Sequence, residues 1–201
     1  MPVLPGKATA VIKFAAGILL LPLFYSFSVS FINEFNTVKG DLALYFWAGA
    51  VSFAILYIFI YQPELIYDYG QQAVGALFNF YKPLARIASY LVPAYTLALF
   101  IIYWVLSVIL GARGITGYFL LLIGFASALH LVFSAKFLNS GRGDFLKADY
   151  IFGFSLVYLV NLLLLGCALS LMLKGFSFAG FFTQSLRESG NIFNIIFNKV
   201  S

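Results

Sequence analysis

Residues 150–173, YIFGFSLVYLVNLLLLGCALSLML, decide the fold, because these 24 consecutive residues include no Asp, Glu, Lys or Arg. A helix rises about 1.5 Å per residue, so about 20 apolar residues cross a hydrocarbon core about 30 Å thick. Backbone amide groups inside a bilayer must pair within their own segment. We therefore interpret this stretch as a transmembrane helix rather than a strand.

Four more charge-free runs of at least 20 residues lie along the chain. Together the five runs predict membrane spans at 12–32, 42–61, 88–110, 117–137 and 150–173. The predicted fold is all-α, a polytopic transmembrane helix bundle of five spans that forms one integral membrane domain over residues 1–201. Small residues, among them Gly49, Ala50, Gly124 and Ala128, mark the faces on which spans are expected to approach closely.

The composition excludes several classes of protein. Of the 201 residues, 63% are apolar and only 9% are charged, against roughly 25% charged residues in a soluble domain. Twelve Lys and Arg with seven Asp and Glu are too few to cover a soluble protein of this size. A soluble enzyme, a nucleic-acid-binding protein and a disordered chain are therefore excluded, and the expected surroundings are a lipid bilayer.

The distribution of cations predicts the orientation of the chain in the membrane. Short cytoplasmic loops carry an excess of Lys and Arg. One side of the predicted bundle receives seven of them, namely Lys7, Lys13, Lys82, Arg86, Lys136, Arg142 and Lys147, and the other side receives Lys39 and Arg113. We therefore expect a cytoplasmic N-terminus. The tail adds Lys174, Arg187 and Lys199 to the poorer side, unless it inserts and brings the C-terminus back.

Two further segments show helical spacing but are neither spans nor plain loops. In residues 62–86, an apolar stripe at Val74, Leu77, Phe78 and Tyr81 faces away from polar residues at Glu64, Asp68, Gln71 and Gln72. This pattern predicts an amphipathic or half-inserted helix. If the helix enters the bundle, the Glu64 carboxylate should be partly desolvated. Residues 175–201 end in helically spaced isoleucines and predict an interfacial C-terminal helix.

The candidate polar site consists of Glu64, Asp68, Gln71, His130, Asp144 and Asp149. His130 is the sole histidine and lies within a predicted span, where ionisable groups are costly and often functional. It shares a helix face with Ser127 and Ser134. We expect it to act in a proton relay or a ligand contact, or to be a neutral ring bonded to one of these serines. Asp149 directly precedes an apolar run and suits a helix cap, and it would not share a helix face with Asp144.

The ligand types that a metal site needs are scarce. The chain has one His and one Cys and no HExxH sequence, so we expect neither a bound metal nor a cofactor. It also contains no GxSxG sequence, the turn that exposes the nucleophile in α/β-hydrolases. No catalytic motif is complete, and the sequence favours a protein that is not an enzyme without settling the point.

Residues 61–67, YQPELIY, resemble a decayed HExxH helix of the site-2-protease-like integral membrane zinc metallopeptidases. Glu64 falls at the catalytic glutamate of that family, and Pro63 and Tyr67 fall at its two histidine positions. Residues 90–96 (YLVPAYT) are similar to a segment that follows the active helix in some bacterial relatives, and so are, in order, residues 129–131, 144–146 and 158–161. Because Pro and Tyr cannot replace the imidazole ligands, the resemblance implies a non-catalytic member in a prokaryotic inner membrane.

Three functions therefore remain open. The first is a non-catalytic scaffold that binds another membrane protein or a segment of it. The second is a small transporter or channel that uses Glu64, Asp68 and His130. The third is a structural or assembly subunit of a membrane complex. The predicted spans carry no ionisable residue in their central turns except His130, which weighs against a coupled transporter.

Overall fold

The computed structural model describes residues 5–38, 40–59, 64–77, 91–110, 114–140 and 148–200, and all regular structure in these ranges is helical. The helices are α1 (Pro5–Phe35), α2 (Leu42–Phe59), α3 (Glu64–Leu77), α5 (Ala94–Leu110), α6 (Thr116–Ser140), α7 (Ala148–Met172) and α8 (Phe178–Val200).

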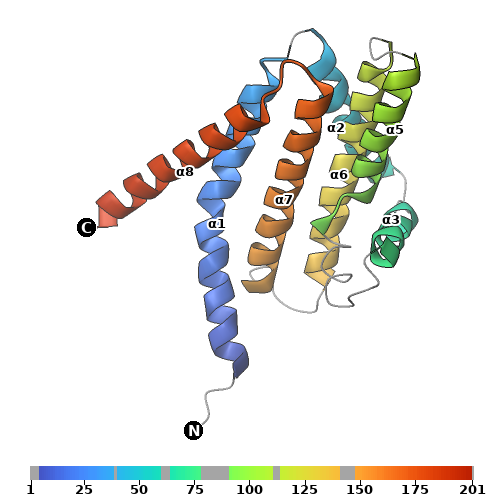
Figure 1. Ribbon diagram of the computed structural model, residues 1–201. Coiled ribbons are helices and arrows are strands. Elements are labelled where there is room, and N and C mark those ends of the chain that lie inside the picture. The colour runs from blue at the N-terminus through green and yellow to red at the C-terminus, as the bar shows by residue number, and fades with distance from the viewer. Residues whose placement is uncertain are drawn as a thin grey trace.

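The long helices run alternately up and down, so that successive long helices finish at alternate ends of the bundle (Figure 1). The C-terminal ends of α1, α5 and α7 lie at one end. The N-terminus and the ends of α2 and α6 lie at the other, where the short helix α3 also lies. Helix α2 packs on α6, and α1 packs on both α7 and α8. Helix α8 leaves α1 at an angle, and its C-terminal end lies away from the other helices.

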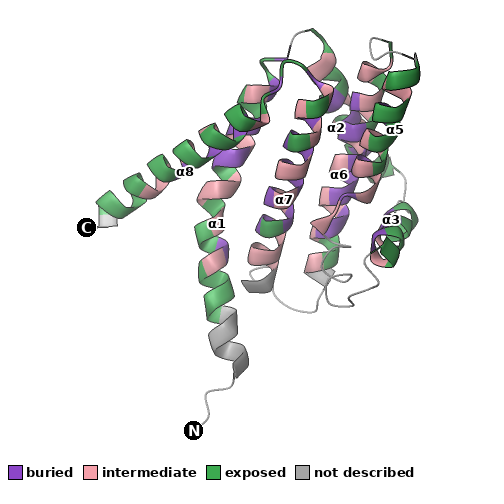
Figure 2. Ribbon diagram, in the orientation of Figure 1, coloured by how far each residue is buried: buried purple, intermediate pink, exposed green. Residues whose placement is uncertain are grey.

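Four helices are long and apolar enough to cross a membrane: Val11–Phe35, Leu42–Phe59, Thr116–Leu138 and Tyr150–Met172. Their positions match four of the predicted spans to within a few residues. Large apolar side chains such as Ile58 (76% exposed) and Leu171 (87% exposed) point outward, as expected where lipid rather than water covers the protein. Buried residues concentrate on the facing sides of the helices (Figure 2).

The remaining predicted span, 88–110, differs from its observed counterpart. Helix α5 is apolar but begins at Ala94 and has only 17 residues, fewer than the about 20 that a full crossing needs. Pro93 stands immediately before it and has no backbone N–H to continue a helix upstream. The first part of the predicted span falls mainly outside the described residues.

Two glycines allow α2 and α6 to approach each other closely. A Cβ atom on Gly49 would lie 1.9 Å from the backbone oxygen of Leu121, and one on Gly124 would lie 2.0 Å from the backbone oxygen of Phe46. Lipid gives helices no hydrophobic reason to associate, so backbone contacts of this kind contribute much of the packing energy. The two helices meet along the small-residue faces that the sequence predicts.

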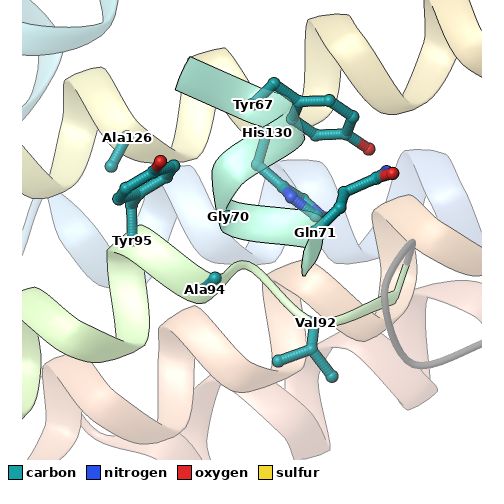
Figure 3. A pocket seen from close by; sticks show the side chains of 8 residues that line it. All are labelled: Tyr67, Gly70, Gln71, Val92, Ala94, Tyr95, Ala126 and His130. Carbon is teal, nitrogen blue, oxygen red and sulfur yellow. The ribbon is translucent and has the colours of Figure 1, made fainter. Parts of the chain in front are cut away.

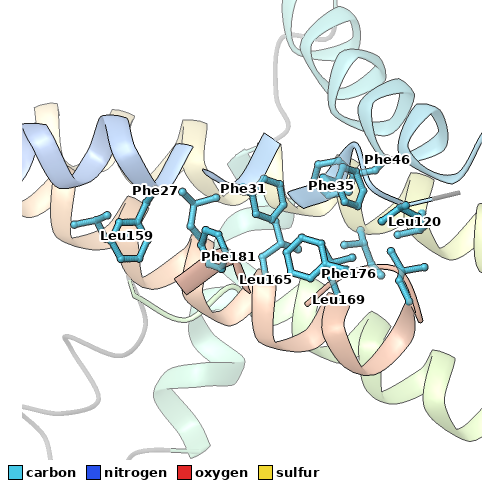
Figure 4. Close-up of a cluster of buried hydrophobic side chains, with 14 residues drawn as sticks. Phe27, Phe31, Phe35, Phe46, Leu120, Leu159, Leu165, Leu169, Phe176 and Phe181 are labelled. Atoms are coloured by element: carbon cyan, nitrogen blue, oxygen red, sulfur yellow. The ribbon is translucent and has the colours of Figure 1, made fainter. Parts of the chain in front are cut away.

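A cluster of aromatic and leucine side chains forms the main core (Figure 4). Phe31 packs between Phe35 and Phe181, with ring centroids 5.6 Å and 5.9 Å away. Leu165 and Leu169 of α7 belong to the same cluster. Edge-to-face contacts between rings add to simple burial. This core joins α1, α2, α6 and α7 to the start of α8.

Candidate functional site

A small polar cavity lies where α3 meets α5 and α6 (Figure 3). Its volume is about 10 Å³, and it is lined by Tyr67, Gly70, Gln71, Val92, Ala94, Tyr95, Ala126 and His130. Four of the eight lining side chains carry polar atoms. We call this space the polar cavity. It is the place where the structure gathers polar groups from three helices.

Helix α3 closes the polar cavity through one face. Tyr67, Gly70 and Val74 are buried, and their spacing of three and four residues places them on the same side of the helix. Gly70 lets the Tyr95 ring approach, because a Cβ atom there would lie 2.7 Å from a ring carbon. The Tyr95 hydroxyl donates a hydrogen bond to the Ile66 carbonyl oxygen. These contacts dock α3 against the N-terminal turn of α5.

A chain of hydrogen bonds links α3 to His130. The hydroxyls of Tyr67 and Ser134 lie 3.0 Å apart, and the Ser134 hydroxyl lies 3.4 Å from Nε2 of His130. His130 is 5% exposed and Ser134 is fully buried. Ser127, the other serine that shares this helix face, pairs with Thr96 of α5 at 3.3 Å.

An outer groove lies on the other side of Tyr67. It has a volume of about 150 Å³ and is lined by Glu64, Tyr67, Asp68, Phe133, Lys136 and Phe137. Glu64 and Lys136 form an ion pair across it, and their side chains are 54% and 53% exposed. The groove therefore offers two carboxylates and one ammonium group beside two phenyl rings.

The Glu64 side chain, for which partial desolvation is expected if the helix enters the bundle, is 54% exposed. Helix α3 does dock on the bundle, but it docks through Tyr67, Gly70 and Val74, and Glu64 lies beside that face rather than on it. The predicted apolar stripe is also only partly buried, because Leu77 is 76% exposed. The rest of that stripe, Phe78 and Tyr81, lies outside the described residues.

The structure thus divides the predicted polar site into two groups. Gln71 and His130 line the polar cavity, and Glu64 and Asp68 line the outer groove. Asp144 lies outside the described residues. Asp149 falls in the first turn of α7 rather than before it, near the positive end of the helix dipole. Tyr67, which borders both spaces, was considered from the sequence only as a substituted metal ligand.

Among the residues that the structure describes, no group of three or more His, Cys, Asp and Glu side chains is placed to hold a metal ion. No protein-family model matches the chain, and neither a curated protein nor a solved structure matches it. The local chemistry is therefore the guide to function.

The sequence analysis did not identify the two faces of α8, because it used the apolar residues of the tail for helical spacing and its cations only for orientation. Phe181, Ser185 and Ser189 of α8 are buried, and their spacing of four residues puts them on one face. Phe181 contacts Phe27 and Phe31 of α1, at 5.7 Å and 5.9 Å between ring centroids. This face packs against α1.

The opposite side of α8 is polar. Arg187, Asn191, Asn194 and Asn198 are all exposed, and their spacing of three and four residues aligns them in one row. Arg187 is two positions, or about 200°, from Ser185, so this row faces away from α1. We call it the amide row. A helical wheel of residues 178–200 would have revealed it.

Proposed function

We propose that this protein is a non-catalytic polytopic membrane protein that binds a segment of another membrane protein, and that α8 carries the contact. The observation behind the proposal is that the amide row of α8 faces away from the bundle. Five crossings with a cytoplasmic N-terminus remain part of this proposal, as does a scaffold related to the membrane zinc metallopeptidases.

The depth of α8 supports a partner. Its Phe181 packs on Phe27, which lies inside the membrane-crossing part of α1, residues 11–35. Phe27 is eight residues from the end of that helix, or about 12 Å at 1.5 Å per residue. The first half of α8, which carries Arg187 of the row, therefore lies beside a span, and its outward side chains would meet lipid. The three asparagines of the row follow in the second half of the helix. Polar side chains at such depth are costly unless another protein group pairs with them.

The chemistry of the row favours protein over lipid headgroups. A helix that lies in the membrane interface usually carries several Lys and Arg on its polar face, where they attract anionic lipids. The row on α8 contains one Arg and three Asn. Amide side chains donate and accept hydrogen bonds at once, and they join helices inside membranes. The expected partner is thus a membrane helix with polar groups of its own.

The second half of α8 also carries apolar side chains that the bundle leaves exposed. Ser185 and Ser189 are buried, whereas Ile196 and Phe197 further along are 44% and 62% exposed. Phe193 and Phe197 stack on each other at 6.4 Å between ring centroids. The second half of the helix therefore presents both an apolar edge and an amide edge beyond α1, which suits a partner that lies alongside it.

Site-specific photocrosslinking in the native membrane tests the proposal. A benzophenone amino acid at position 191 should form a discrete adduct with a second protein, and the same probe at Leu19, exposed on α1, should yield lipid adducts only. The adduct should disappear when Asn194 and Asn198 are both changed to Leu, and persist in an Ile58→Ala control. Lipid adducts alone at position 191, or a protein adduct that survives loss of the amides, would refute the role of the amide row.

A further inference from the structure

The side-chain amide of Gln71 is a buried donor without a partner among the described residues. Its Nε2 atom has almost no exposed area and makes no hydrogen bond there. Gln71 lies in the middle of α3 and lines the polar cavity (Figure 3). A buried polar group without a hydrogen bond loses its contact with water and gains nothing in return, which destabilises the fold. Such groups in folded proteins are usually satisfied by an ordered water.

The size of the polar cavity suits one such molecule. Its volume is about 10 Å³, and a space of about 10–15 Å³ accessible to a water-sized probe holds one water. A substrate, a hydrated ion or a lipid headgroup is too large for it. A cavity of this size stays dry only where its walls are apolar, because a buried water needs two to four polar partners.

Three helices contribute polar side chains to the walls of this cavity. Gln71 and Tyr67 come from α3, and His130 comes from α6. Tyr95, which also lines the space, donates its own proton to the Ile66 carbonyl and keeps a lone pair on its oxygen. The glutamine amide and the imidazole are therefore the groups that one water can join across the contact between α3 and α6.

We infer that the polar cavity is a binding site for a single water molecule, which accepts a hydrogen bond from Nε2 of Gln71 and contacts the imidazole of His130. The water connects α3 to α6 through side chains other than the Tyr67–Ser134 pair. It also explains why a glutamine rather than an apolar residue faces inward at this position of α3. This inference does not depend on the function proposed for α8.

The single histidine makes the water directly observable. Protein labelled with ¹⁵N only in histidine, reconstituted in lipid bilayers, yields ring signals from His130 alone. Magnetisation transferred from water protons in solid-state NMR should reach these nitrogens in the wild type. Gln71→Met keeps the side-chain length and removes the amide, so the transfer should be lost. Gln72→Met is the matched control, because Gln72 is exposed, and should leave it unchanged.

Each other outcome overturns the inference. Absence of transfer in the wild type means that the cavity is dry. Transfer that persists in Gln71→Met means that water reaches the imidazole without the amide. If Gln71→Met does not fold, a density map that resolves ordered waters decides instead. A peak within hydrogen-bond distance of Nε2 of Gln71 supports the inference, and a map without one refutes it.

Discussion

At the scale of single residues, the contact between α2 and α6 depends on the absence of two side chains. Gly49→Ala would place a methyl group 1.9 Å from the Leu121 oxygen, a distance that no contact tolerates. Because the obstacle is backbone, the helices must separate. We expect a loss of about 1–3 kcal/mol or more in the free energy of unfolding, measured by thermal unfolding in detergent.

The matched control is Gly190→Ala in α8, where no atom lies within 4 Å of the added methyl group. Alanine is favoured over glycine in a helix by about 1 kcal/mol, so this change should raise the unfolding midpoint. Equal effects of the two substitutions would contradict the close approach of α2 and α6.

The sequence predicts only partly which glycines lie at the contact between α2 and α6. Small residues in residues 42–61 and 117–137 predict that these helices approach closely, but they do not tell Gly49 from Ala50 as the point of contact. That choice depends on the rotation of each helix about its own axis. Contacts with a third helix determine this rotation. One of them joins Phe46 of α2 to Phe35 of α1, at 5.1 Å between ring centroids.

At the scale of the element, α3 docks on the bundle and leaves the charged residue Glu64 about half exposed. Glu64 and Lys136 are each about half exposed, and ion pairs of this kind contribute about 0–1 kcal/mol. We expect Glu64→Gln to change the free energy of unfolding by no more than a few tenths of a kcal/mol. Thermal unfolding in detergent at pH 5 and pH 8 measures this.

Tyr67→Phe provides the comparison for the docked face of α3. It removes the hydroxyl that pairs with Ser134 at 3.0 Å and leaves a buried polar group on α6 with one partner fewer, so it should cost more than Glu64→Gln. A larger loss for Glu64→Gln than for Tyr67→Phe would mean that the exposed pair, and not the buried face, holds α3 in place.

The amphipathic pattern of residues 62–86 predicts a helix but not which of its residues are covered. The stripe through Val74 and Leu77 is apolar in sequence, yet the bundle covers Tyr67, Gly70 and Val74. Tyr67 is amphipathic, and its ring can pack while its hydroxyl pairs with Ser134. The approach of α5 through Gly70 and Tyr95 selects this face, and the residues of α3 alone do not reveal it.

At the scale of the whole molecule, the helices alternate in direction. The side of the membrane that one end of the bundle faces therefore fixes the side that the other end faces. The C-terminal ends of α1 and α5 lie at the same end of the bundle, and the N-terminal end of α1 lies at the other. The bias of seven cations against two favours a cytoplasmic N-terminus. On a Cys167→Ser background, single cysteines at positions 142 and 113 should therefore be labelled from the cytoplasm and from outside, respectively.

A membrane-impermeant thiol reagent applied to intact cells and to inverted vesicles measures both positions. Labelling of position 142 from outside, with position 113 protected, would reverse the assigned orientation. Labelling of both positions from one side would instead contradict the crossing of the membrane by α6, because these positions flank that helix.

The sequence by itself determined that this is an all-helical protein with apolar helices long enough to cross a membrane. The reason is local: 24 residues without a charge have one stable way to satisfy their backbone in lipid, and neighbours are not needed to specify it. Only the tertiary structure decided that Gln71 and His130 line one cavity, that Glu64 meets Lys136 and that the amide row of α8 faces away from α1. The first two arrangements bring together residues that are 59 and 72 positions apart. All three depend on how each helix is rotated and tilted against the others, which the residues of one helix do not specify.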